Sequence, residues 1–252
     1  MTHTNDPTPP PVPAPEPTPQ PEPRLEPLPD RIDIRNLFEA LLRRPADLAG
    51  HPSIDTPATL GRLAIMAFVA ILVFGFVLGT FAYHEQLWAA PLKLGVGLIF
   101  AGLICFPSFY IFSCLAGSTA SAGRLASLLG ATLALAGLLL LGFAPAVWIF
   151  TQGTSSFGFM GTLSIGSWLV ALGFAFRFAT TALKVQGARQ RGPIAIWCVI
   201  FLLVTLQLTT SLRPILGRSD RLLTDEKKFF LQHWSETAGK SLTECRETPG
   251  DE

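Results

Sequence analysis

Arg177 is the residue whose position most strongly suggests chemistry, because it is the only formal charge well inside a long apolar stretch. A charge held within a bilayer is costly and often marks the path of an ion or a substrate. Arg177 also lies about two helical turns before Lys184, so its long stem could carry the guanidinium to the lipid headgroups or to a structural partner. No acidic residue lies in any apolar stretch to pair with it, which argues against a proton relay.

Two prolines and a polar segment are further candidates. Pro107 and Pro145 each remove a backbone donor inside an apolar stretch. Such breaks either line a cavity or are packing kinks whose freed carbonyls bind nearby hydroxyls. Gln207 opens a polar run that ends at Arg213 and Pro214, and these side chains either line a path or hydrogen-bond neighbouring helices.

Gly75 and Gly79 form a Gly-x-x-x-Gly pair in the first apolar stretch. Small residues at this spacing let two helices approach closely in lipid. The pair predicts a packing face, used either by another helix of the same chain or by a second copy in a homo-oligomer.

No set of residues predicts catalysis. The four cysteines form no Cys-x-x-Cys pair, and the histidines lie in tails or loops, at His3, His51, His84 and His233. No nucleophile–base set, zinc motif or phosphate-binding loop is present. We therefore expect no catalytic residue, no cofactor and no metal, and a protein that is not an enzyme.

The elements that carry these residues are predicted from hydropathy. Only 15% of the 252 residues are charged and the mean hydropathy is +0.43, whereas soluble domains carry about a quarter charged residues. Five apolar stretches are each long enough to cross the ~30 Å hydrocarbon layer. They predict an all-α integral membrane protein, a compact bundle of about five transmembrane helices within residues 60–212, with spans near 60–83, 92–115, 125–151, 159–183 and 193–212.

The flanking regions differ from the bundle. Residues 1–29 are proline-rich and too polar to bury a core, so we expect a disordered tail that is either a docking ligand or a spacer. Residues 213–252 form a C-terminal tail with a short amphipathic aromatic helix near 224–234.

Residues 30–59 form a juxtamembrane region that contains an amphipathic helix. Its apolar side chains recur at helical spacing, at Ile34, Leu37, Phe38, Leu41 and Leu42. Asp30 or Asp33 can cap its start, and Pro45 ends it. The helix is suited either to the membrane surface or to packing on the protein's own loops.

Lysine and arginine counts predict the orientation. Basic residues precede the first span and lie in the loops after the second and fourth, at Arg43, Arg44, Arg62, Arg124, Lys184, Arg189 and Arg191. The positive-inside rule then places the N-terminus in the cytoplasm and, with five spans, the C-terminus outside. The C-terminal tail is also basic, but the agreement among the loops outweighs it.

Several elements resemble an uncharacterised family of bacterial multi-span inner-membrane proteins. The elements are Cys105-Phe-Pro-Ser-Phe-Tyr110, Gly142-Phe-Ala-Pro145 and Ser211-Leu-Arg-Pro214, and the resemblance covers about three quarters of the chain. It implies location in the bacterial inner membrane and no assigned activity. The topology is also similar to that of Yip-type membrane proteins, which suggests a membrane-organising role.

These observations predict a non-enzymatic membrane scaffold or accessory subunit that recruits partners at the membrane. The alternative is a small transporter or channel component, based on Arg177, the two kinks and the polar run. The expected partners are membrane lipids, a protein at the N-terminal tail and a second copy of the chain. The net charge of only +1 does not favour nucleic acid.

Overall fold

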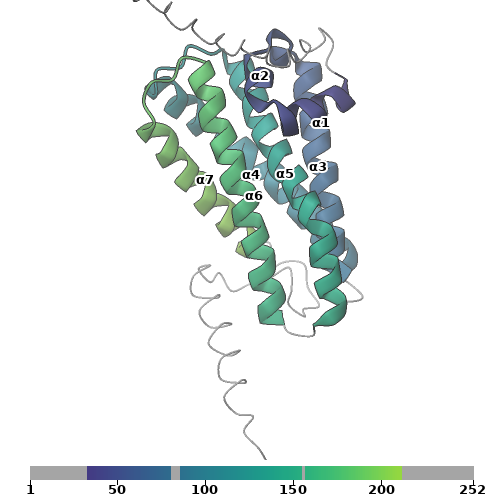
Figure 1. Ribbon diagram of the computed structural model, residues 1–252. Helices are drawn as coiled ribbons and strands as arrows, with labels where there is room; N and C mark the ends of the chain where they lie inside the picture. Colours follow the sequence, from purple (N-terminus) through teal and green to yellow (C-terminus); the bar gives the residue numbers. More distant parts are fainter. Residues whose placement is uncertain (1–32, 81–85, 155–156, 212–252) are drawn as a thin grey trace, which may run out of the picture.

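Five long helices run side by side, and three short helical segments gather at one end of the bundle (Figure 1). The computed structural model describes residues 33–80, 86–154 and 157–211. The long helices are α3 (Pro57–Gly79), α4 (Gln86–Leu115), α5 (Ala122–Gly153), α6 (Phe157–Val185) and α7 (Gly192–Ser211). The short segments are α1 (Ile34–Arg43), α2 (Pro45–Gly50) and the 3₁₀ turn η1 (Pro52–Asp55). We call the end that carries them the α1 end.

The prediction of an all-α membrane bundle is confirmed. Within the described ranges, four helices are long and apolar enough to cross a membrane, and α7 adds a shorter apolar stretch over Gly192–Leu208. The same part of the chain contains no strand. One boundary differs from the sequence prediction: α4 starts at Gln86, so the residues up to Pro91 are helical rather than a loop.

Local side-chain chemistry explains where α3 and α5 begin. The Thr56 side chain accepts a hydrogen bond from the Thr59 N–H, and the Ser121 side chain accepts one from the Arg124 N–H. Both are N-caps, which satisfy donors that the first helical turn leaves free. Asp33 is the N-cap residue of α1, but its side chain makes no capping hydrogen bond, so the predicted cap is only positional.

Helices α4 and α6 end in the same way. Gly117 and Gly187 follow them with φ of 92° and 87°, in the left-handed region that favours glycine. In each case the glycine N–H bonds back to the carbonyl three residues earlier, and the next N–H bonds back five residues. This is the Schellman pattern, which satisfies the last carbonyls of a helix and reverses the chain.

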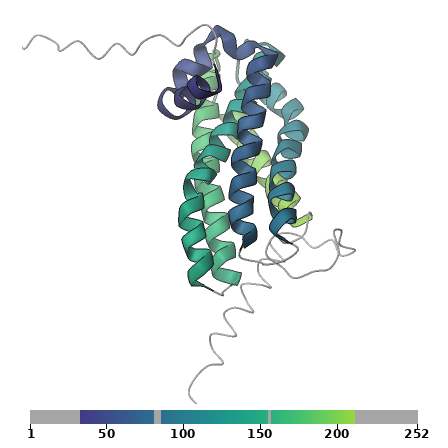
Figure 2. The same cartoon turned by 90° about the vertical axis from the view of Figure 1, so that its right-hand side faces the viewer.

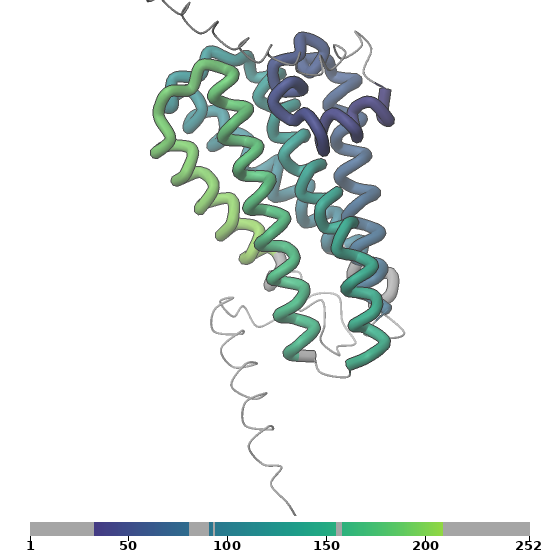
Figure 3. Tube along the Cα trace, in the orientation of Figure 1, coloured from purple at the N-terminus to yellow at the C-terminus, as the bar shows by residue number. Residues whose placement is uncertain are grey.

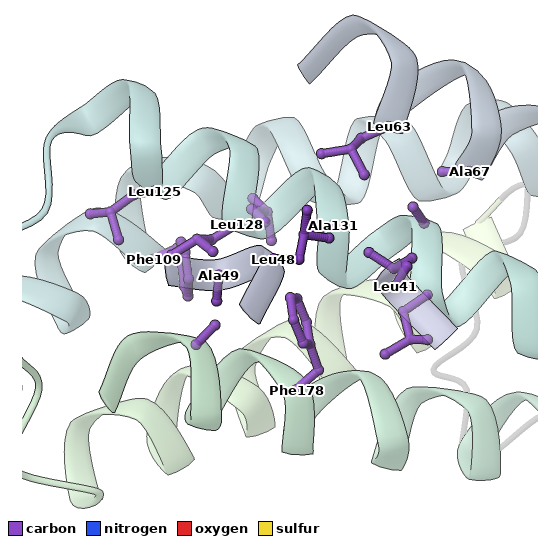
Figure 4. Packing of buried hydrophobic residues seen from close by; sticks show 14 of the residues in the cluster. Leu41, Leu48, Ala49, Leu63, Ala67, Phe109, Leu125, Leu128, Ala131 and Phe178 are labelled. Carbon is purple, nitrogen blue, oxygen red and sulfur yellow. The ribbon is translucent and has the colours of Figure 1, made fainter. Parts of the chain in front are cut away.

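The short segments at the α1 end are part of the core rather than an appendage. They bury Leu37, Leu41, Leu48 and Ile54 in the same cluster as residues of the long helices (Figure 4). Helix α2 packs on α6, while α1 packs on α3 and α5. The tube trace shows α1 lying against the upper flank of the bundle, below the tips of the loops (Figure 3).

Helix α5 packs closely on α3 through two glycines that lie two turns apart. A Cβ at Gly130 would lie 3.0 Å from Leu60 Cδ1, and one at Gly137 would lie 3.1 Å from the Ala67 carbonyl oxygen. Glycine lets the two backbones approach closely. In lipid, apolar side chains gain little from leaving their surroundings, so the dispersion contacts made at this close approach stabilise the helix pair. Helix α5 also packs on α6, and α4 packs on α3 and α7.

Gly75 faces α4. A Cβ at this position would lie only 2.5 Å from the Cα of Pro91, which is a backbone atom that a side-chain rotation cannot move. Its partner in the Gly-x-x-x-Gly pair, Gly79, is also buried. This face of α3 is therefore covered by the chain's own helix.

We predict that Gly75→Ala destabilises the bundle, because the added methyl group must push α3 and α4 apart. Overpacking of this kind costs about 1–3 kcal/mol. The matched control is Gly142→Ala, because a Cβ there meets nothing within 4 Å. Heating in detergent followed by size-exclusion chromatography measures both, and equal melting temperatures for the two variants would contradict the prediction.

Candidate functional site

The strongest cluster of long-range polar contacts lies at the α1 end, where side chains from two hairpins hold the N-terminal segment. Arg124 Nη2 donates to the Ala49 carbonyl at 3.0 Å and to the His51 carbonyl at 3.4 Å. Gln186 Nε2 donates to the same Ala49 carbonyl at 2.8 Å. We call these three contacts the Ala49 clamp. They satisfy carbonyls at the end of α2, for which no further turn of the helix supplies N–H donors.

A second contact joins η1 to the start of α5. Ser121 Oγ donates to the Asp55 carboxylate at 3.1 Å while it caps α5. Gly123 leaves room for that carboxylate, since a Cβ there would lie 2.9 Å from Asp55 Oδ1. Asp55 and Ser121 are therefore held by each other and by the start of the helix.

The two loops at this end are hydrogen-bonded to each other in a reciprocal way. The Thr119 N–H donates to the Gln186 carbonyl at 3.3 Å, and the Arg189 N–H donates to the Ala116 carbonyl at 2.9 Å. Ser118 Oγ adds a bond to the Gln186 carbonyl at 3.2 Å. The α4–α5 and α6–α7 hairpins thus form one platform on which the N-terminal segment rests.

The histidine of the N-terminal segment that rests on this platform has a structural role. His51 Nδ1 accepts a hydrogen bond from the Ser53 N–H and so caps the 3₁₀ turn η1. Within the described ranges, no group of three or more His, Cys, Asp or Glu side chains lies close enough to hold a metal ion.

Arg177 lies on the outside of the bundle. Its side chain is exposed on α6, and its carbonyl accepts hydrogen bonds from Thr180 and Thr181, each at 2.9 Å. The neighbouring Phe178 is buried in the main core cluster. Since adjacent helical residues point in directions about 100° apart, the guanidinium points toward the surroundings of the protein.

Pro107 lies near a buried contact between α4 and α7. The Cys105 carbonyl accepts hydrogen bonds from Ser108 Oγ at 2.8 Å and from Trp197 Nε1 at 3.3 Å. Trp197 is fully buried, and its ring centroid lies 4.5 Å from that of Phe109. Pro107 itself is exposed on α4. The buried Trp197 instead joins α7 to α4 at the Cys105 carbonyl, two residues before the proline.

The other candidates are spread over the bundle. Pro145 lies inside α5, which continues through it to Gly153. Gln207 lies near the end of α7 with its side chain exposed. Arg213 and Pro214 lie outside the described residues, as do the proline-rich tail and the aromatic segment near 224–234. Among the sequence-predicted site residues that the structure describes, only the neighbouring glycines of α3 lie together.

Sequence reasoning missed the residues of the clamp. It counted Arg124 only as a positive charge in a loop, and it did not single out Gln186 or Ala49. The available signal was weak: a lone arginine follows Ser-Ala-Gly at a predicted helix start. Its acceptor lies 75 positions away in the sequence, and no local pattern encodes such a pair.

No family model matches the chain, and the comparisons with curated proteins and with solved structures also find no match. The resemblances drawn from the sequence therefore stay predictions.

We predict that Arg124→Met releases the α2–η1 segment. The change leaves the Ala49 and His51 carbonyls without their guanidinium donor, which costs about 1–3 kcal/mol. Hydrogen–deuterium exchange over residues 45–55 should rise, together with a lower melting temperature. Arg191→Met removes the same charge from the exposed loop before α7 and serves as the control. Equal changes in hydrogen–deuterium exchange and melting temperature for the two variants would contradict the prediction. They would show that Arg124 acts through its positive charge and not through its hydrogen bonds to the Ala49 and His51 carbonyls.

Proposed function

We propose that this protein is a non-enzymatic scaffold or accessory subunit of the bacterial inner membrane, and that it presents its N-terminal tail to a partner in the cytoplasm. The Ala49 clamp is the observation that supports this most directly. It fixes the segment from Ile34 to Asp55 on the bundle. Residues 1–32 are therefore joined to a fixed point on the membrane domain.

The distribution of charge supports the orientation. Near the α1 end, the described loops and helix ends carry Arg124, Lys184, Arg189 and Arg191. Both hairpin loops at this end are short, so the positive-inside rule applies to them. In the proposed orientation the clamp, the platform and the tail all lie on the cytoplasmic side.

The transporter alternative has less support. A transport path needs polar or charged groups that face the interior of the bundle. Among the described residues, the fully buried polar side chains are serines and threonines, and none is charged. Thr132, Ser167 and Thr205 donate to carbonyls of their own helices four residues earlier. Among the described residues, the buried hydroxyls of Ser113 and Ser164 have no hydrogen-bond partner, and neither carries a charge. Arg177 faces outward.

The sharpest test is deletion of residues 1–32. We expect a stoichiometric partner to co-purify with the full chain and to be lost after this deletion, with no change in melting temperature. A longer deletion that includes α1 would remove Leu37 and Leu41 from the core, and a lost partner could then reflect unfolding.

A matched variant tests which property of the tail matters. Replacing the prolines of residues 1–29 with serine keeps the length and charge but removes the preformed polyproline II structure that aromatic grooves bind. Loss of the partner in this variant supports recruitment through proline-rich recognition. A partner that stays bound after deletion of residues 1–32 would overturn the proposed role of the tail.

A further inference from the structure

Helix α1 has three different faces. Its first face carries Leu37, Ala40 and Leu41, which are 0%, 2% and 1% exposed and lie in the core. These contacts fix the rotation of the helix about its own axis. The directions in which its remaining side chains point are therefore determined by the packing of the protein.

The second face is apolar but exposed. Ile34, Phe38 and Leu42 follow one another at intervals of four residues, and they are 53%, 43% and 45% exposed. Residues at this spacing lie along one side of a helix. The three side chains lie next to the buried face, so the apolar surface of the bundle continues onto α1.

The third face is charged. Arg35, Glu39 and Arg43 are exposed at the same interval of four residues, and Arg43 Nη1 lies 3.1 Å from Glu39 Oε1. A helix with an apolar face beside a basic polar face is typical of the boundary between headgroups and acyl chains. In α1 the first, buried face packs on the protein itself, so only the second and third faces are left for the membrane surface.

Arg177 also lies toward the α1 end of the bundle, about two helical turns before α6 ends at Val185. Leu41 of α1 and Phe178 of α6 both belong to the main core cluster and are labelled in Figure 4. Arg177 is the residue before Phe178, and it is exposed on the outer face of α6. In the view turned by 90°, α1 lies against the side of the bundle near its α1 end (Figure 2). Two separate elements thus place exposed charges beside apolar surface near this end.

We propose that the exposed apolar face of α1 rests in the bilayer leaflet at the α1 end, and that Arg35, Arg43 and Arg177 bind the phosphates of anionic phospholipids. Ile34, Phe38 and Leu42 insert among the acyl chains, while the arginines reach the headgroups. This assignment goes beyond the scaffold role, because it names a lipid ligand for the membrane domain.

Lipid fits this face better than a second protein. Three half-exposed side chains fall far short of the roughly 800 Å² that each partner buries in a stable interface. Helix α1 packs on α3, which itself exposes apolar side chains such as Ile65 and Val69. Those side chains belong to a helix that crosses the membrane, so their neighbour is lipid.

Nitroxide labels on α1 test the insertion. The full chain, with its four cysteines replaced by alanine, receives single cysteines at the exposed positions 34, 38 and 42, and at the control positions 35, 39 and 43. The labelled proteins are placed in vesicles of phosphatidylcholine and phosphatidylglycerol. We expect labels at 34, 38 and 42 to collide with oxygen and to be shielded from a water-soluble nickel complex. Labels at the control positions should be open to the nickel complex.

Two results would overturn the proposal. Equal access of the nickel complex to positions 38 and 39 would mean that water covers the apolar face. Shielding of position 38 from both oxygen and nickel would mean that a protein, either a partner or a second copy, covers it. All six labelled positions are exposed in the folded protein, so the labels leave the core intact.

The choice of headgroup is tested with Arg177→Gln. An arginine near an anionic surface favours binding by about fivefold, so native mass spectrometry should find about fivefold less retained phosphatidylglycerol than in the unaltered chain. Arg191→Gln, at the exposed loop tip, is the control and should retain it fully. Equal retention of phosphatidylglycerol by the Arg177→Gln and unaltered chains would overturn the role of Arg177.

Discussion

The Ala49 carbonyl accepts two side-chain hydrogen bonds, and the position of the whole N-terminal segment depends on them. The six-residue helix α2 leaves its last carbonyls without helical partners, and burial of Ala49 keeps water from satisfying them. Arg124 at the start of α5 and Gln186 after α6 supply the donors. Because these donors come from two different hairpins, the same carbonyl also fixes the hairpins relative to α2. The reciprocal backbone bonds between the two loops strengthen this arrangement.

Below this polar end, the bundle is held by shape rather than by polar contacts. Lipid solvates leucine about as well as protein does, so helices in a membrane gain little from hiding apolar surface alone. Close approach at Gly75, Gly130 and Gly137 gives dispersion contacts that lipid chains cannot match. The buried Trp197 serves the same purpose for α7, where it also donates to a backbone carbonyl of α4. The polar platform thus sets which helices are neighbours, and the small residues set how closely they pack.

The outer surface follows a different rule from the core. The exposed side chains of the long helices are mostly apolar and are suited to lipid. The charged groups Arg35, Glu39, Arg43 and Arg177 are exposed toward the α1 end. Such an arrangement is stable because a long arginine stem can lie along apolar surface while its charge reaches the headgroups. The charge in α6 is thereby compatible with a membrane helix, although no acidic side chain in the described part of the chain pairs with it.

The sequence by itself determined the features that depend on neighbouring residues. Hydropathy predicted the long helices within a few residues, apart from the start of α4, which begins six residues earlier than predicted. Pro45 was correctly predicted to end α1, since it cannot continue a helix. Periodicity identified the apolar residues of α1, but it could not separate Leu37 and Leu41, which the protein buries, from Phe38 and Leu42, which it exposes. That division depends on where α3 and α5 lie in space. For the same reason the sequence placed Arg124 only among the loop charges and Arg177 inside a span. In the structure Arg124 holds the N-terminal segment, and Arg177 is exposed on the outside of the bundle. Hydropathy and capping act between residues a few positions apart, whereas only the packed helices decided which groups meet across the bundle and which face the lipid.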